Sequence, residues 1–370
     1  MPSIEENLGL KEVVTPKEAK FEKWRNRVGF VLAPLAFLLI YFASFESLKP
    51  EAQNLAAIIA VVIIFWICES LPMPVTALIG AALCVLFKVA DAKTVFAPFA
   101  DPLMFLFIGS FIIARAIFLH DLDKRFAYGV LSLKWIGARP SRILFAFGAV
   151  TAFASAWISN TATTAMMFAI GMSILAFLFK HEEETGIKIN RNYATAMMLI
   201  TSFAASIGGL MTPIGTPPNV IGLGFIRNLL GAEISFFKWM MIGAPIVVVL
   251  YIFLYGYLNF LASAGVKEIP GSTEMIRREK AELGKWTRGQ KSTIIAFLTA
   301  VFLWVFSGLI ALFAGETSAI YKAINSRLPE AVGAVIGACL LFLLPGNAKG
   351  EKAITWGEAV KIDWGVILLY

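Results

Sequence analysis

The sequence has few charged residues and few of the residues that bind metals or form disulfides. Charged residues make up 15% of the 370 residues, and there are three cysteines and two histidines. Cys68, Cys84 and Cys339 all lie in apolar segments, which predicts small packed side chains and no disulfide or metal framework. The motifs of zinc proteases, serine hydrolases and P-loop nucleotide-binding proteins are also missing, so the sequence does not predict an enzyme.

Long apolar runs are what the sequence has in abundance. Hydrophobic residues make up 58% of it, which favours an integral membrane protein. We expect an all-α polytopic protein, because crossing a bilayer takes roughly 20 apolar residues. The candidate segments are residues 28–45, 54–68, 71–87, 96–119, 143–179, 193–226, 235–263, 291–314 and 329–345. Residues 1–27 are charged and have no apolar core, so we expect a cytoplasmic amino-terminal arm and not a signal peptide.

The net charge of +7 is explained by membrane orientation and not by nucleic-acid binding. Lys and Arg concentrate in alternate loops, with 24 in these loops and 7 in the others. Because basic loops stay on the cytoplasmic side, we expect a multi-pass plasma membrane protein with a cytoplasmic amino terminus and no nucleic-acid partner. The basic loops are residues 1–27, 120–142, 180–191, 263–291 and 346–361.

The apolar segment 143–179 is interrupted by the polar stretch Ser155–Thr164, which carries hydroxyl groups and one carboxamide. Unpaired polar groups in hydrocarbon are costly, so this stretch needs a partner, a cavity or a ligand. One crossing here would put the basic loop 180–191 outside, whereas a segment that enters and returns keeps every basic loop cytoplasmic. We therefore predict a re-entrant helical hairpin over residues 143–180 with its tip at Ser159–Thr164. The alternative is that these side chains only bond to helix carbonyls or join helices.

A second interruption lies in Ser206–Asn219, which contains three prolines and three glycines. Such a run cannot form a continuous helix, so residues 192–263 are predicted to form a broken helix 5 and a helix 6. In many transporters, unwound loops and half-helix ends hold cations and anionic substrates. Residues 121–142, before the hairpin, have the spacing of an interfacial amphipathic helix, and residues 264–290 are predicted to be a cytoplasmic loop.

Two segments of the chain are related to each other. Leu71–Ala81 matches Leu328–Ala338 at seven of eleven positions, although apolar Ala/Gly-rich segments also match by chance. An odd number of passes between them predicts an inverted-topology repeat. Residues 291–370 would then be the start of the second repeat (helices 7, 8 and part of 9). The hairpin's counterpart is then expected roughly 50 residues beyond Tyr370, so we expect a carboxy-terminally truncated part of a longer protein.

Four motifs resemble those of the divalent anion/sodium symporter (DASS) family. They are Ser159-Asn160-Thr161, Gly215-Thr-Pro-Pro-Asn219, the turn Trp66–Pro74 and Asp363-Trp364-Gly365. The resemblance runs from about residue 28 to the end. It implies a sodium-coupled importer of di- and tricarboxylates such as succinate, malate, fumarate and citrate, a homodimer when full length, and an elevator mechanism. The implied scaffold domain includes residues 28–120 and 291–370, and the implied transport domain includes residues 143–180 and 192–263.

The resemblance also implies the site residues. Sodium, a transported ion and not a prosthetic group, is expected at Ser155, Ser159, Asn160 and Gly215. The carboxylate substrate is expected at Ser159, Asn160, Thr161, Thr216 and Pro217. Neutral oxygens of these types suit sodium, and the start of the helix after Thr161 suits an anion. A sodium-independent exchanger and a non-transporting fragment remain the alternatives.

Two charged residues lie near or within apolar segments, where ionisable groups are functional candidates. Glu69 is expected to be an exposed, structural residue in the turn between helices 2 and 3. Arg115 is expected to reach the cytoplasmic surface or to pair with Asp121 or Asp123.

Overall fold

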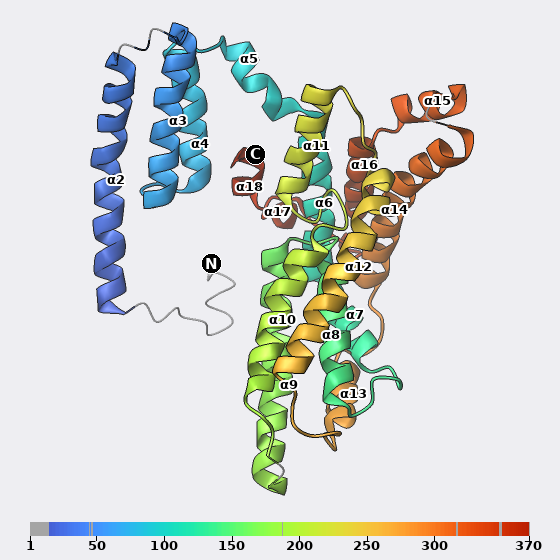
Figure 1. The fold of residues 1–370 in the computed structure, drawn as a ribbon. Helices are drawn as coiled ribbons and strands as arrows, with labels where there is room; N and C mark the ends of the chain where they lie inside the picture. The colour runs from blue at the N-terminus through green and yellow to red at the C-terminus, as the bar shows by residue number, and fades with distance from the viewer. Residues whose placement is uncertain are drawn as a thin grey trace. The chain divides into compact units, whose positions relative to one another are not determined.

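A computed structural model describes residues 15–43, 45, 47–186, 188–315, 317–347 and 350–369 (Figure 1). In this part of the chain the elements are helices, apart from an isolated bridge between Pro345 and Lys352. Six of the described helices are long and apolar enough to cross a membrane, or seven if α15 and α16, bent by 47°, count as one span. The prediction of an all-α polytopic membrane protein is confirmed.

The chain forms two compact units, one made of the residues up to Met104 together with those from Asp363, and the other of Phe105–Ile362. The first unit contains α2 (Pro16–Phe42), α3 (Pro50–Cys68), α4 (Met73–Leu86), α5 (Ala92–Phe96), η1 (Ala97–Ala100) and α18 (Trp364–Leu369). Helix α6 (Pro102–Leu119) begins in the first unit and continues in the second. The second unit contains α7 (Leu122–Leu131), α8 (Pro140–Ser155), α9 (Asn160–Thr185), α10 (Asn192–Gly208), α11 (Pro217–Leu230), α12 (Phe236–Leu261), α13 (Ser272–Glu282), α14 (Arg288–Ala314), α15 (Ala319–Arg327), α16 (Glu330–Leu343) and α17 (Trp356–Ala359).

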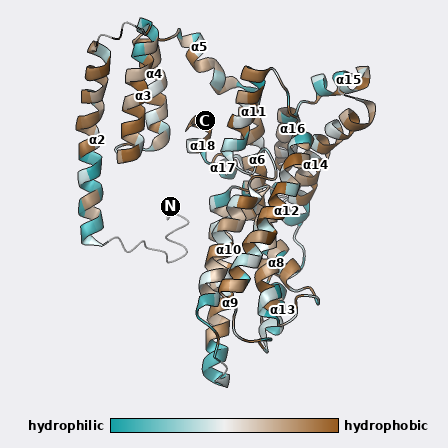
Figure 2. Cartoon of the chain, viewed as in Figure 1, coloured by the Kyte–Doolittle hydropathy of each residue, from teal (hydrophilic) through white to brown (hydrophobic). Residues whose placement is uncertain are grey.

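Helix α2 begins twelve residues earlier than the apolar pattern predicts. Thr15 and Glu18 form a capping box, in which the Thr15 N–H donates to Glu18 Oε2 (2.7 Å) and the Glu18 N–H donates to Thr15 Oγ1 (3.3 Å). Pro16 follows at the first helical position, where its missing N–H costs nothing. The amino-terminal arm is therefore helical from Pro16, with a hydrophilic first part that Figure 2 shows in teal; residues 1–14 lie outside the described residues.

The largest apolar core lies in the second unit, around α8. Residues of α7, α8, α9, α10, α12 and α13 contribute to it. Tyrosines of two neighbouring helices bind α8 carbonyls: Tyr193 Oη donates to Pro140 O (2.9 Å), and Tyr251 Oη donates to Phe145 O. These bonds and the apolar packing fix the helix that leads to the polar stretch.

The two halves of the internal repeat have the same local structure. In both, a Leu-Pro pair precedes a 14-residue helix whose N-cap is the proline, Pro72 for α4 and Pro329 for α16. A short capped helix follows in each, α5 or α17, and then an aspartate whose side chain accepts a backbone N–H at the next helix. Asp101 accepts from Leu103 (2.9 Å) and Asp363 from Val366 (3.1 Å). This correspondence supports a true repeat over a chance match.

The segment predicted as a cytoplasmic loop, residues 264–290, contains α13, which packs against α7. The Arg125 guanidinium donates to the carbonyls of Leu283 (2.5 Å) and Gly284 (3.0 Å) after the end of α13 and lies 4.8 Å over the Trp286 ring. The segment is thus partly helical and packs within the second unit.

Asp123 on α7 is 7% exposed, and this burial raises the pKa of its carboxyl to about 6.

Candidate functional site

The polar stretch forms a tight turn between α8 and α9. Helix α8 ends at Ser155, and Ser159 is the N-cap of α9, its hydroxyl accepting the Ala162 N–H (3.4 Å). The buried Ser155 Oγ donates to Asn160 Oδ1 (2.7 Å) across the turn. The predicted tip at Ser159–Thr164 is wrong, because Ser159 caps α9 and the helix begins at Asn160; the turn itself is residues 156–159. We call Ser155–Asn160 the hairpin turn.

The second interruption forms an unwound loop between α10 and α11, residues 209–216. The buried Asn219 side chain closes it, with Nδ2 donating to Gly209 O and to Thr212 O, both at 2.8 Å. The Gly215 N–H donates to Thr212 Oγ1 (3.1 Å). A carboxamide inside the following helix therefore bonds to two carbonyls of the unwound loop.

The hairpin turn and the unwound loop are in close contact, and glycines make the contact possible. A Cβ on Gly209 of the loop would lie 2.3 Å from Asn160 Oδ1 of the turn, and one on Gly208, the last residue of α10, would lie 2.0 Å from Ala152 O of α8. A Cβ on Gly215 would lie 2.5 Å from Gly209 O. Asn160 and Gly215 therefore both lie beside Gly209.

The structure places the predicted site residues in two groups. Ser155, Ser159, Asn160 and Gly215, predicted for sodium, belong to the hairpin turn or the adjoining loop. Thr161 is exposed in the first turn of α9, and Thr216 and Pro217 begin α11, where the Thr216 hydroxyl caps no N–H. No described contact joins Thr161 to Thr216 or Pro217. Their substrate role stays a prediction.

Thr212 and Asn219 were not predicted as site residues, although they hold the unwound loop together. Thr212 is completely buried, and its hydroxyl also donates to Ala156 O in the hairpin turn. The sequence signal was available, since both are polar residues within the Pro/Gly-rich run. What they bond to depends on the tertiary structure.

The chemistry of the site is that of neutral oxygen atoms. No residue of the hairpin turn or of the unwound loop is charged, and no cluster of three His, Cys, Asp or Glu side chains occurs among the described residues. Hydroxyl, carboxamide and backbone carbonyl oxygens are hard ligands of the kind that alkali cations accept. The starts of α9 and α11 add the positive ends of two helix dipoles. This arrangement can hold a cation and an adjacent anion.

An aromatic cluster anchors the hairpin turn on its other side. The Trp157 ring meets Phe297 of α14 edge-on at 5.2 Å and stacks on Phe236 of α12 at 6.3 Å. Phe236 in turn stacks on Trp304 at 4.6 Å. Trp304 Nε1 donates to Glu330 O (2.9 Å), and the Phe236 N–H donates to the Glu330 carboxylate. The position of the turn is thereby linked to the starts of α12 and α16.

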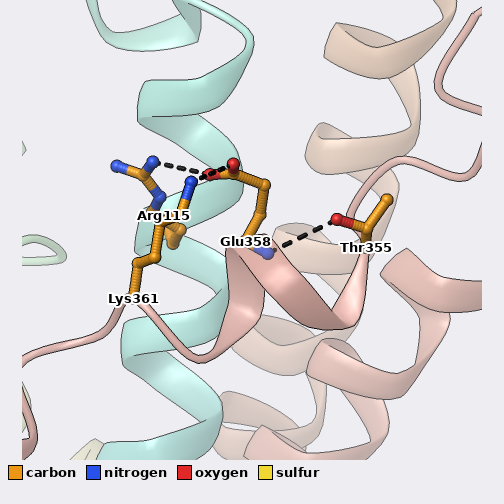
Figure 3. A network of polar contacts seen from close by, with 4 residues as sticks. All are labelled: Arg115, Thr355, Glu358 and Lys361. Carbon is orange, nitrogen blue, oxygen red and sulfur yellow. Dashed lines mark hydrogen bonds and ion pairs between the residues drawn. The ribbon is translucent and has the colours of Figure 1, made fainter. Parts of the chain in front are cut away.

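The charged residues near apolar segments have structural partners. Arg25 binds Glu69 at 2.5 Å, and the Glu69 side chain is 58% exposed, as expected. Arg115 binds Glu358 at 2.6 Å, and Lys361 binds the same carboxylate (Figure 3). The expected pairing of Arg115 with Asp121 or Asp123 is wrong, because α17 brings Glu358 to α6. The hydrogen bonds from Lys361 and then Arg115 lower the pKa of Glu358.

Comparisons with known proteins agree with the motifs. A family model described as the sodium:sulfate symporter transmembrane region matches residues 22–370. The sodium-dependent dicarboxylate transporter SdcS of Staphylococcus saprophyticus is 33% identical over 360 residues, covering 96% of this chain and 67% of the relative. The protein of the same name from Staphylococcus aureus strain USA300 is 32% identical over 348 residues, covering 93% of this chain and 65% of the relative. The chain thus spans about two thirds of the length of these curated relatives. It belongs to the sodium:sulfate symporter family, which is the divalent anion/sodium symporter family that its motifs resemble.

Proposed function

We propose that the protein is a secondary active transporter that imports di- or tricarboxylates together with sodium. The names of the relatives, sodium-dependent dicarboxylate transporters, support the substrate class and the coupling ion. The observation that carries the proposal is the contact between the hairpin turn and the unwound loop, where Asn160 and Gly215 both lie beside Gly209. Neutral oxygens converge there without a charged group, which suits a transported ion that must bind and then leave.

Sodium is proposed to bind among Ser155, Ser159, Asn160 and Gly215. The carboxylate is proposed to bind next to it, at Ser159, Asn160, Thr161, Thr216 and Pro217. Helix α9 offers the N–H groups of Asn160 and Thr161, which have no carbonyl four residues earlier within the helix. The N–H groups of Ala162 and Thr163 already bond to Ser159. Helix α11 begins with two prolines that have no N–H, so its contribution is mainly its dipole. A bound sodium ion would supply the positive charge that the side chains lack.

The membrane arrangement is part of the proposal. Helix α8 has 16 residues, about 24 Å at 1.5 Å per residue, which is shorter than a hydrocarbon core of about 30 Å. Helix α9 has 26 residues and is long enough to cross alone, so the proposed re-entrant hairpin rests on the short α8 and on the basic loops. The basic loops also support a multi-pass plasma membrane protein with a cytoplasmic amino terminus. We further propose a homodimer in which residues 143–180 and 192–263 move as a transport domain.

The experiment is uptake of labelled succinate by proteoliposomes with sodium or choline outside. Uptake that rises with external sodium supports symport. Uptake that ignores sodium but accelerates with succinate inside would identify the alternative, a sodium-independent exchanger. Absence of both responses in protein that remains folded would indicate a non-transporting product.

A further inference from the structure

The Thr212 side chain joins the two segments of the proposed sodium site. Its Oγ1 donates a hydrogen bond to Ala156 O in the hairpin turn and accepts one from the Gly215 N–H (3.1 Å) in the unwound loop. A hydroxyl has one hydrogen to donate and lone pairs to accept, so both bonds can exist at once. The side chain is completely buried. One oxygen atom therefore sets the spacing between Ala156 and Gly215.

The backbone of Thr212 is held as firmly as its side chain. Its carbonyl accepts hydrogen bonds from Asn219 Nδ2 (2.8 Å) and from the Gly215 N–H (3.3 Å). Asn219 also binds Gly209, which lies against Asn160. Movement of Thr212 would therefore displace the loop as a whole.

The Ala156 carbonyl also needs the hydrogen bond from the Thr212 hydroxyl. Ala156 follows the last residue of α8 and is completely buried, and a carbonyl at a helix end has no intrahelical partner. Ala156 lies directly between Ser155 and Trp157, so the direction of its carbonyl is tied to the backbone path of the hairpin turn. The uncharged Thr212 hydroxyl donates a hydrogen bond to this carbonyl.

We propose that Thr212 is a positioning residue for sodium binding, acting through Gly215 and the hairpin turn. This inference rests on the proposed function. A cation bound between two segments needs both at a fixed separation before it arrives, and residues that orient the ligands of an ion control its affinity. Thr212 sets that separation, and its removal weakens sodium binding without removing any of the proposed ligands.

The variants are Thr212→Val, which keeps the shape and removes the hydroxyl, and Thr212→Ser, which keeps the hydroxyl. Thr201→Val is the matched control, because Thr201 is 1% exposed and its hydroxyl donates to Met197 O (2.7 Å) within α10, its one partner among the described residues. The first measurement is the sodium concentration that gives half-maximal thermal stabilisation of purified protein, with choline chloride keeping the ionic strength constant.

Thr212→Val is expected to raise this concentration about tenfold or more, while Thr212→Ser restores it and Thr201→Val leaves it unchanged. Equal sodium dependence in Thr212→Val and wild type would overturn the proposal. So would an equal change in Thr201→Val, which would indicate a general effect of losing a buried hydroxyl.

The second measurement is hydrogen exchange in sodium-free buffer, which does not depend on ion binding. Thr212→Val is expected to speed exchange in peptides that contain residues 156–159 and 213–216, unlike Thr201→Val. No change there would overturn the link between the two segments. A wild-type protein that ignores sodium, with faster exchange in Thr212→Val, would overturn the proposed function and still support the link.

Discussion

The backbone N–H of Phe236, the first residue of α12, donates a hydrogen bond to the carboxylate of Glu330, the first residue of α16. The two residues are 94 positions apart in the chain. A helix start has N–H groups without intrahelical acceptors, and a carboxylate there is favoured by the helix dipole. No salt bridge to Glu330 occurs among the described residues. This bond holds the start of α12 at the aromatic cluster that contacts the hairpin turn.

Glu330→Ala is expected to lower the free energy of unfolding by about 1–3 kcal/mol, because the N–H of the buried Phe236 loses its acceptor. Glu330→Gln keeps an acceptor oxygen and should lose less. Thermal unfolding in detergent measures both. Glu233→Ala is the control, since this carboxylate is exposed in the loop before α12; an equal effect there would show that charge alone matters.

Gly208→Ala is expected to lower the free energy of unfolding by about 1–3 kcal/mol, the range for overpacking a close contact. The added Cβ would lie 2.0 Å from Ala152 O, a backbone atom that cannot turn away. Gly224→Ala is the matched control, because a Cβ there meets nothing within 4 Å. The control should be neutral or gain up to about 1 kcal/mol from helix propensity. If both variants unfold at the same temperature, the close approach of α10 to α8 is wrong.

Asn160→Ala is expected to abolish sodium-stimulated succinate uptake and the stabilisation of purified protein by sodium. The change removes the partner of Ser155 Oγ and the carboxamide beside Gly209. Asn228→Ala, at an exposed position near the end of α11, controls for loss of an amide. Near-normal uptake in Asn160→Ala would exclude Asn160 from the site.

Asp123→Asn is expected to stabilise the protein at neutral pH. Burial raises the Asp123 pKa from 3.8 to about 6, so the folded protein holds this proton more tightly than the unfolded chain. This contribution to stability is present below pH 3.8 and is lost as the pH rises through about 6. The variant should therefore exceed wild type by on the order of 3 kcal/mol at pH 7 and approach it near pH 4.

Unfolding temperatures between pH 4 and pH 8 test this prediction. Asp121→Asn is the control, because the Asp121 side chain is 52% exposed and paired with Lys124. A wild-type curve that runs parallel to that of Asp123→Asn over the whole range would show that Asp123 has an ordinary pKa.

The sequence predicted what depends on local pattern and missed what depends on distant contacts. Apolar runs and the Pro/Gly break located the helices and the unwound loop. The polar stretch predicted a turn, but at Ser159–Thr164, whereas the structure has it at residues 156–159. The start of α2 was missed by twelve residues, although Thr15, Pro16 and Glu18 form a standard capping signal. The partners of Arg115, Thr212 and Phe236 were not, since Glu358, Ala156 and Glu330 lie 56 to 243 residues away and meet them only in the folded chain.

The neutrality of the hairpin turn and the unwound loop has an electrical consequence. None of their side chains gains or loses a proton near neutral pH, so this part of the site adds no protein charge that varies as cargo binds and leaves. In the proposed transport cycle, the current should then equal the charge of the bound sodium ions minus that of the carboxylate. Its variation with pH should follow the titration of the substrate, which makes reversal potentials a direct count of ions per anion.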